Sequence, residues 1–226
     1  MLAQHFPVLN LRLTTPGLLL KLPDEDQLTE LADVAAGGIH DPAMMPFTVP
    51  WTALPPRERA RSVVVHHWAT LGRWTPQSWS VPFVVIGDGQ VLGLQTISGR
   101  QFTVTRECSS GSWLGRQFHG HGVGTLMRTM VANFAFEGLG AAAMVSAAYD
   151  DNPASLAVSR KLGYRDDGIS RHEVQGTLRI SRRLRLNRDD WRANPGPAVN
   201  IDGLDECRAM FGLALTDLAH PDQART

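Results

Sequence analysis

The sequence predicts a fold of mixed α and β structure, and three observations support this prediction. Short apolar segments of strand length, such as residues 81–86, alternate along the chain with amphipathic segments of helical period, such as residues 123–134. Glycine, proline, Asp and Asn residues separate these segments, as expected at turns and at helix ends. A chain of 226 residues is also long enough to bury one substantial core.

Composition and charge exclude several classes of function. The formal net charge is zero and no block of Lys or Arg occurs, which argues against nucleic acid or an anionic membrane as the main partner. The longest apolar runs are far too short to span a bilayer, and the first residues, MLAQHFPVLNL, do not resemble a signal peptide. The two cysteines, Cys108 and Cys207, lie far apart in the sequence. We therefore expect an intracellular, reduced protein with a cytoplasmic location.

The first 72 residues contain one predicted strand region and two predicted helices. Residues 9–23 alternate apolar and polar side chains, which predicts a strand with a break at Pro16. Residues 24–38, DEDQLTELADVAAGG, begin with acidic residues and end in two glycines, as a helix does. Residues 57–72 predict a second helix. The loop at 40–56, HDPAMMPFTVPWTALPP, is long and aromatic, and loops of this kind tend to be functional.

The middle of the chain predicts a hairpin, a further strand and a long helix. Residues 80–98 form the hairpin, with Asp88 and Gly89 at its turn. The strand pattern continues through residues 101–115, where glycines and serines indicate a bulge or a local break. A helix is then expected to run to about Gly138. Its apolar stripe consists of Val123, Leu126, Met127, Met130, Val131 and Phe134.

The last third of the chain predicts a buried strand, a compact helix and a hairpin. The strand is AAAMVSAAY, and the helix lies within DNPASLAVSRKLGY, residues 151–164, with Asn152 as N-cap. Strands near 164–169 and 177–186 would form the hairpin. The domain is expected to span residues 1–192, and residues 193–226 would be a C-terminal extension with a short helix over GLDECRAMFGLAL packed on the same domain.

The segment FHGHGVGTLM, residues 118–127, places three glycines at the start of a predicted helix. A helix N terminus after a glycine turn can bind an anion through unpaired backbone N–H groups. A Walker loop would need a lysine before Thr125, and the dinucleotide fingerprint would need another glycine spacing. A metal site on His119 and His121 would need a further ligand, for which only Cys108 is near, so we expect no metal. Taken alone, the glycines are a weak signal, and a turn that binds nothing would explain them nearly as well.

The motif HGHGVG, followed about thirty residues later by DNPASLAVSRKLGY, resembles the GCN5-related N-acyltransferases (GNAT). Within them it is similar to the RimJ/RimL-like branch, which modifies the amino termini of ribosomal proteins. The resemblance extends from LTTPGLLLKLP to LRLNRDDW. It implies an α+β fold of α/β/α layers, with a mostly antiparallel sheet of about seven strands that is splayed in the middle. His119 stands where the family usually has Arg or Gln, and Leu126 where this branch often has Glu.

This resemblance also implies a co-substrate, acetyl-CoA or another acyl-CoA, and no metal. The diphosphate of the acyl-CoA would lie on backbone N–H groups of the glycine turn, and the thioester of the acyl-CoA would lie beside a splayed strand at Trp113 and Leu114. The Leu114 N–H would stabilise negative charge on the thioester oxygen, an effect worth roughly 3 kcal/mol. Asn152 would bind the pantetheine arm. Arg128, Arg160 and Lys161 could reach the ribose phosphate, although a solvated charge on a helix is the default interpretation of all three. The residues implied at the diphosphate are His119, Gly120, His121, Gly122, Val123, Gly124 and Thr125.

The hydroxyl that acts at the departing sulfur is expected on the helix after the turn. Many family members have a Tyr where this chain has Ser159, whereas the amino-terminal branch has a Ser one turn earlier, which matches Ser155. Ser155 is therefore the first candidate and Ser159 the second. Asn152 and Ser155 also have an ordinary structural explanation, as N-cap and first-turn residues of a helix.

Candidates for the acceptor side come from the long loop and a strand entry. His40 and Asp41 are candidates for a base or for acceptor contact, and Phe47, Trp51 and Trp79 are either groove walls or core. No suitable Glu precedes the glycine turn. An α-amine is neutral in roughly a tenth of molecules at pH 7, against about one in two thousand for lysine, so an amino-terminal acceptor needs less help from a base.

These observations predict an enzyme that transfers an acyl group, most simply acetyl, to a primary amine, with a peptide or protein amino terminus favoured. The alternatives are a non-catalytic module that binds or senses acyl-CoA, and an enzyme that uses succinyl-CoA or a small-molecule amine. The resemblance also makes a homodimer plausible.

Overall fold

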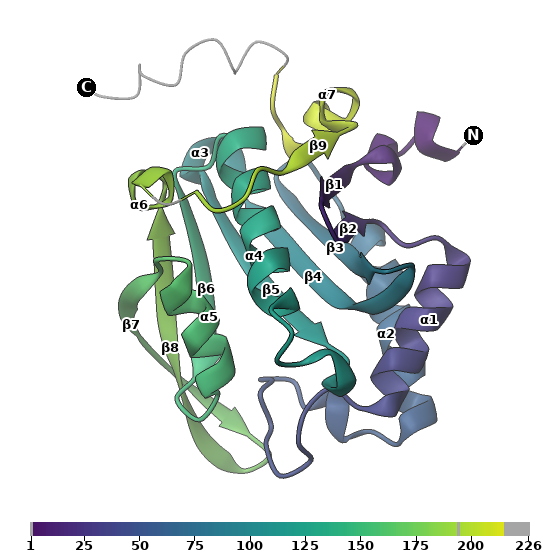
Figure 1. Ribbon diagram of the computed structural model, residues 1–226, viewed down its shortest axis with the longest axis vertical. Helices are drawn as coiled ribbons and strands as arrows, with labels where there is room; N and C mark the ends of the chain where they lie inside the picture. Colours follow the sequence, from purple (N-terminus) through teal and green to yellow (C-terminus); the bar gives the residue numbers. More distant parts are fainter. Residues whose placement is uncertain (1, 194, 215–226) are drawn as a thin grey trace.

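The computed structural model describes residues 2–193 and 195–214. In this part of the chain, nine strands form one sheet in the order β7-β8-β6-β5-β4-β3-β2-β1-β9 (Figure 1). The strands are β1 (Arg12–Thr15), β2 (Leu18–Lys21), β3 (Ser78–Gly87), β4 (Gln90–Arg100), β5 (Glu107–Leu114), β6 (Ala143–Tyr149), β7 (Arg165–Val174), β8 (Thr177–Asn187) and β9 (Asn200–Asp202). Neighbouring strands are antiparallel except for β5 and β6, which are parallel.

Helices cover both faces of this sheet, with α4 and α5 on one face and α1 and α2 on the other (Figure 1). The α-helices are α1 (Glu25–Gly37), α2 (Pro56–Gly72), α3 (Phe102–Thr105), α4 (Val123–Asn133), α5 (Pro153–Lys161), α6 (Arg188–Ala193) and α7 (Leu204–Cys207). The mixed, mostly antiparallel sheet between helices that the sequence predicts is therefore confirmed.

Alternation along β3 explains how one strand serves two cores. Phe83 and Val85 face the cluster around α4, whereas Val84 between them faces the cluster of α1 and α2. This is the two-residue period of a strand buried on both faces. The α4 stripe that the sequence predicts packs in the first cluster, and Met130, Val131 and Phe134 are fully buried there. A π-helical turn, Phe134–Gly138, continues α4 to the predicted end.

The sheet has nine strands where the sequence predicts about seven, and two short segments account for the difference. The predicted strand with a break at Pro16 is in fact two antiparallel strands, β1 and β2, because Gly17 has φ +90° and the chain reverses there. The other additional strand is β9, which pairs with β1 through only three residues. Three residues are too few for alternation to reveal a strand.

One predicted strand segment is wrong. The sequence pattern predicts that residues 101–105 extend a strand, but α3 occupies Phe102–Thr105 between two residues of left-handed backbone, Gln101 and Arg106. The turn buries Phe102 completely against Trp79, at a ring-centroid distance of 5.5 Å. Burial of this aromatic ring outweighs the local strand propensity of the segment.

The described part of the C-terminal extension, residues 195–214, contributes β9, α7 and a short 3-10 turn at Arg208–Phe211. Phe211 is fully buried and packs edge-on against Trp79, with ring centroids 4.9 Å apart. The division of the chain at residue 193 stays a prediction, and residues 215–226 lie outside the described part. None of the described helices is both long and apolar enough to cross a lipid bilayer.

Candidate active site

A cleft of about 710 Å³ opens where β5 and β6 separate. Its walls are the end of β5, the glycine turn before α4, the start of α5 and the loop after α1. In Figure 1, this region lies at the ends of β5 and β6 near the starts of α4 and α5, where the loop between α1 and α2 crosses. The cleft therefore gathers segments that are more than 100 residues apart in the sequence.

The pairing register shows how the sheet opens. β6 pairs with β5 only at three positions, from Glu107 with Ala143 to Ser109 with Val145. Beyond Ser109, β5 stays paired with β4 as far as Leu114, while β6 stays paired with β8 as far as Tyr149. One edge of β5 therefore faces the cleft instead of a neighbouring strand.

The backbone of Leu114 points toward this open edge. Gly115 donates its N–H to the Leu92 oxygen on β4 at 2.9 Å. Because successive residues of a strand point their N–H groups in opposite directions, the N–H of Leu114 points away from β4. Its carbonyl points the same way and accepts a hydrogen bond from His119 Nε2 at 3.1 Å. The Leu114 N–H therefore faces the cleft, and its role as donor to the thioester oxygen stays a prediction.

The glycine turn has the geometry of an anion cradle. Gly120 and Gly122 have φ values of +83° and +81°, and no atom lies within 4 Å of the position that a Cβ would take at either residue. His119 N–H bonds to Arg116 O, and Thr125 N–H bonds to Gly122 O. In the described part of the chain, the N–H groups of residues 120–124 bond to no protein acceptor. The predicted set of donors, residues 119–125, is therefore narrowed to 120–124.

These features fit the diphosphate of coenzyme A. Unpaired N–H groups at the N terminus of an 11-residue helix attract negative charge, and glycines at the turn leave room for phosphate oxygens. Within the turn itself, residues 118–125, the sequence has no Asp or Glu that would repel a phosphate. The residues present therefore fit the co-substrate that the sequence implies.

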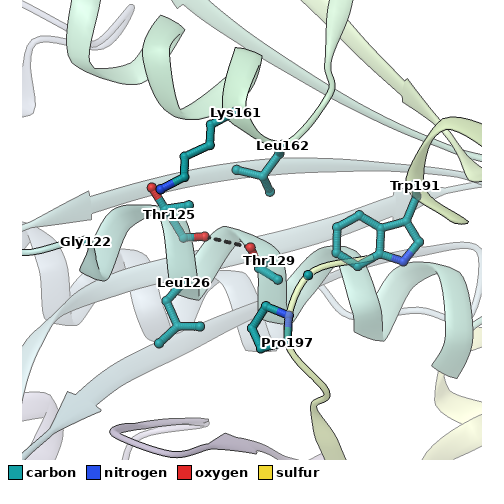
Figure 2. A pocket seen from close by; sticks show the side chains of 9 residues that line it. Gly122, Thr125, Leu126, Thr129, Lys161, Leu162, Trp191 and Pro197 are labelled. Carbon is teal, nitrogen blue, oxygen red and sulfur yellow. Dashed lines mark hydrogen bonds between the residues drawn. The ribbon is translucent and has the colours of Figure 1, made fainter. Parts of the chain in front are cut away.

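A second cavity of about 360 Å³ adjoins the outer side of the turn. Figure 2 shows it between Thr125, Leu126 and Thr129 of α4, Lys161 and Leu162 at the end of α5, and the side chains of Trp191 and Pro197. The two cavities share Gly122 and Thr125. A ligand that lies on the turn can therefore reach both.

The start of α5 brings Asn152 and Ser155 to the cleft. Asn152 Oδ1 accepts the N–H of Ser155 at 3.1 Å, as an N-cap does, and both residues line the cavity. Ser159 lies one turn further and is fully buried. It donates to Ser155 O at 3.0 Å and accepts from Arg128 Nη2 at 2.9 Å. This position argues against Ser159 as the hydroxyl at the sulfur.

The opposite wall of the cleft comes from the loop after α1, with His40, Asp41 and Phe47. His40 Nδ1 lies 2.8 Å from the Asp41 carbonyl oxygen, to which it must donate, and Nε2 lies 2.8 Å from Thr52 Oγ1. Both ring nitrogens are thus engaged within the protein, which argues against His40 as a free general base. Asp41 is the only carboxylate among the described residues that line the cleft.

Aromatic rings support this wall from behind. Phe47 packs on Trp51 at a centroid distance of 5.4 Å, and Trp51 packs on Trp113 at 5.7 Å. Trp113 and Phe47 line the cleft, but Trp51 does not. Tyr149, at the end of β6, anchors the same loop through a hydrogen bond between its hydroxyl and Thr48 Oγ1 at 3.1 Å.

Trp79 needs a correction, because the structure places it in the core and not at the acceptor wall. It is 2% exposed and packs among Trp74, Phe102 and Phe211. Its ring lies over Gly99 of β4, whose missing side chain makes the space for it. Three further residues predicted at the co-substrate, His121, Val123 and Arg160, place no side chain in the lining of the cleft. Of these, His121 and Val123 stay candidates only through their backbone N–H groups.

Sequence reasoning missed several residues of the cleft. Ser110 and Ser112 of β5 and Ser146 of β6 line the opened strands. Arg128, which the sequence offers only as a candidate contact of the ribose phosphate, instead lines the cleft from α4 beside Ser155. A charged helix residue is solvated by default, so the sequence alone offers little reason to bury Arg128. Its position between Met127 and Thr129, next to the apolar stripe, was the available signal.

A sheet opened between its two parallel strands, with an anion cradle at the opening, is the architecture of the GCN5-related acetyltransferases. Residues 18–165 match the family model described as acetyltransferase (GNAT) domain. The chain belongs to this family and is an acetyltransferase. The described residues contain no group of three or more His, Cys, Asp or Glu side chains that could hold a metal ion.

Solved structures show the same fold. Mycobacterium smegmatis RimJ in complex with CoA-disulfide is similar with a TM-score of 0.66 and 18% identity, over 88% of this chain and 92% of that one. RimL, a ribosomal L7/L12 alpha-N-protein acetyltransferase solved in complex with coenzyme A, has a TM-score of 0.61 and 15% identity, over 78% and 97%. A GCN5-related N-acetyltransferase from Brucella melitensis has a TM-score of 0.63 and 18% identity, over 82% and 86%.

Proposed function

We propose that this protein transfers the acetyl group of acetyl-CoA to a primary amine, with the α-amine of a peptide or protein as the favoured acceptor. The observation that carries the proposal is the opened edge of β5, where the Leu114 N–H faces a cleft that Ser155 also lines. The family of the chain supports the chemistry. Structural neighbours named as ribosomal-protein acetyltransferases support the type of acceptor.

When bound, acetyl-CoA supplies an acyl carbon activated as a thioester. The N–H groups of residues 120–124 hold the diphosphate, and the side-chain nitrogen of Asn152 remains available for a carbonyl of the pantetheine arm. The Leu114 N–H stabilises negative charge that develops on the acyl oxygen, an effect of roughly 3 kcal/mol for one well-placed donor. Ser155 Oγ donates a hydrogen bond to the sulfur.

The acceptor side favours an amine that needs little help from a base. His40 has both ring nitrogens bonded within the loop, and Asp41 is the single carboxylate of the described cleft wall. A carboxylate at this wall attracts an ammonium group, and an α-amine then loses its proton to water far more easily than lysine does. An unblocked chain terminus therefore fits this wall better than an internal lysine.

The test is acetylation of matched peptides with several acyl-CoA donors, followed by mass spectrometry that locates the acyl group. One set of peptides has a free α-amine and no lysine, and the other has a blocked amino terminus and one internal lysine. We expect modification of the first set with acetyl-CoA and thiol release above the blank. Modification of lysine alone would overturn the assignment of an α-amine as the acceptor. A preference for succinyl-CoA would overturn the assignment of acetyl as the transferred group. Tight coenzyme A binding without turnover on any amine would overturn catalysis in favour of a sensing module.

A further inference from the structure

Arg128 is a buried cation without an anionic partner among the described residues. It projects from α4 and is only 6% exposed. Arg208, also buried, pairs with Asp205 at 2.9 Å. In the part of the chain that the structure describes, no Asp or Glu oxygen lies within 4.0 Å of Arg128. An unpaired buried charge is costly, so this arginine calls for an explanation.

The guanidinium makes its contacts with neutral groups. Nη2 donates to Ser159 Oγ at 2.9 Å, and Nη1 lies 3.4 Å from the Ser155 carbonyl oxygen. Cζ lies 5.3 Å from the centroid of the Tyr164 ring. Burial raises the pKa of Tyr164, so its phenol is neutral at physiological pH. These contacts orient the positive charge but do not balance it.

The guanidinium is held at the part of the cleft where Ser155 lies. Arg128 lines this cleft, and its Nη1 contact is with the backbone of Ser155 itself. The N terminus of α5 adds further positive potential at the same point, because the helix dipole has its positive end there. The strand residues opposite, Ser110 and Ser146, are neutral. The site therefore favours an anion beside Ser155.

We propose that Arg128 is the electrostatic partner of the thiolate that acyl transfer releases beside Ser155, an inference that rests on the proposed function. In this step the amine nitrogen bonds to the acyl carbon, and the carbon–sulfur bond breaks. The electron pair of that bond goes to sulfur, the amine loses one proton to water, and the sulfur later takes one proton from water. Arg128 acts on the sulfur through space and remains protonated throughout.

Other charged groups near the cleft are weaker sources of this effect. Arg116, His119 and Asp41 are exposed, so solvent screens their charges. His40 is engaged with Asp41 O and Thr52. Burial raises the pKa of the Cys108 thiol on β5, which keeps this group neutral. A cation held in the low dielectric of the α4–α5 interface acts more strongly at the same distance.

The test measures the pKa of the coenzyme A thiol while it is bound, from the ultraviolet absorbance of the thiolate during a pH titration. This measurement needs no amine acceptor. In the unaltered protein we expect the bound thiol to be at least about tenfold more ionised at a given pH than free coenzyme A. Arg128→Met, which keeps most of the volume and removes the charge, should lose this difference, and Arg128→Lys should keep most of it.

Two results would overturn the inference. The first is a bound thiol in the unaltered protein that ionises no more readily than free coenzyme A. This result overturns the inference even if Arg128→Met does not fold. The other is a folded Arg128→Met protein with the thiol ionisation of the unaltered one, since a purely structural arginine changes thermal stability only. Acyl transfer with unchanged thiol ionisation would remove this inference and leave the proposed function standing. Enhanced ionisation of the bound thiol without acyl transfer to any amine would overturn the proposed function and leave the electrostatic effect of Arg128 standing.

Discussion

The imidazole Nε2 of His119 lies 3.1 Å from the carbonyl oxygen of Leu114. A carbonyl can only accept a hydrogen bond, so Nε2 carries the proton and the bond joins the glycine turn to the last residue of β5. The same strand end presents the Leu114 N–H to the cleft. His119 therefore contacts the strand beside which the acyl group is proposed to lie.

We expect His119→Ala to lower kcat about fivefold, because one hydrogen bond of about 1 kcal/mol that fixes Leu114 is lost. The affinity for coenzyme A should stay within about twofold, since the proposed donors to the diphosphate are the backbone N–H groups of residues 120–124, which this substitution leaves in place. Steady-state kinetics and calorimetry measure the two effects. His119→Gln keeps a donor and should recover part of the rate. His121→Ala is the control, because it removes a side chain that does not line the cleft and keeps the backbone N–H of the glycine turn. A large loss of coenzyme A affinity with unchanged kcat would contradict this role.

Ser155→Ala and Ser159→Ala should separate chemistry from stability. Ser155 lines the cleft, so removal of its hydroxyl should lower kcat about tenfold and leave the free energy of unfolding nearly unchanged. Ser159 is fully buried and accepts from Arg128, so its removal should cost about 1–2 kcal/mol of stability. Kinetics and urea unfolding of both variants test this assignment. It fails if Ser155→Ala turns over at the normal rate.

Local patterns in the sequence predicted the elements around the cleft well. The N-cap Asn152 and the left-handed Gly163 bound α5, and the Asp88–Gly89 turn joins β3 to β4, as expected. Asp24 forms a full capping box with Gln27 at the start of α1. These features depend on backbone geometry within a few residues, so a single sequence contains the information that specifies them.

Features that depend on distant contacts could not be predicted in the same way. Trp79 occupies the core because Gly99 leaves room and Phe211, from the far end of the described chain, covers it. The burial of Arg128 depends on α5 and on Tyr164, which lies 36 residues later in the chain (164 minus 128). Nothing within one helical turn of Arg128 reveals these partners. Propensity and pattern therefore locate the site, but packing decides which side chains enter it.

Substitution of two neighbouring glycines should distinguish the anion cradle from a simple turn. Gly122 has φ +81°, so Gly122→Ala strains the turn by about 1 kcal/mol and places a methyl group in the space for the diphosphate. Gly124 lies inside α4 without positive φ, and its added Cβ would meet only Leu114 Cδ1 at 3.9 Å. We expect Gly122→Ala to weaken coenzyme A binding about tenfold or more, while Gly124→Ala binds normally and is slightly more stable. Calorimetric titration of both variants with coenzyme A measures this difference. Equal affinities of Gly122→Ala and Gly124→Ala for coenzyme A would argue for a turn without a ligand.

Lys161 should recognise the 3′-phosphate at the far end of coenzyme A. Its side chain borders the second cavity, which shares Gly122 and Thr125 with the cleft (Figure 2). Lys161 is exposed, and an exposed ion pair is worth at most about 1 kcal/mol, so Lys161→Ala should weaken coenzyme A binding about threefold to fivefold. The same substitution should leave the affinity for 3′-dephospho-coenzyme A unchanged, and Arg160→Ala, outside both cavities, is the matched control. Equal losses with both ligands would place the phosphate elsewhere.

His67 of α2 should make the stability of the fold depend on pH. The side chain is buried, and its Nδ1 has no hydrogen-bond partner among the described residues. Burial, with a smaller contribution from the neighbouring His66, lowers the pKa of His67 from 6.5 to about 4. The neutral ring is therefore favoured in the folded state, whereas the unfolded chain takes up a proton below about pH 6.5. The contribution of the neutral His67 ring to the free energy of unfolding is fully present above about pH 6.5. It is lost as the pH falls to about 4, and the loss amounts to at most about 3 kcal/mol.

Urea unfolding of the unaltered protein and of His67→Leu between about pH 4.5 and pH 7.5 measures this contribution. Leucine fills a similar space without a titratable group, so the slope of the unfolding free energy against pH should decrease over the window in which His67 titrates. His66→Gln is the control, because His66 is exposed on the same helix and its removal should leave most of the slope in place. If His67→Leu keeps the full slope, then other groups cause the acid sensitivity and the buried ring of His67 is protonated in the folded state.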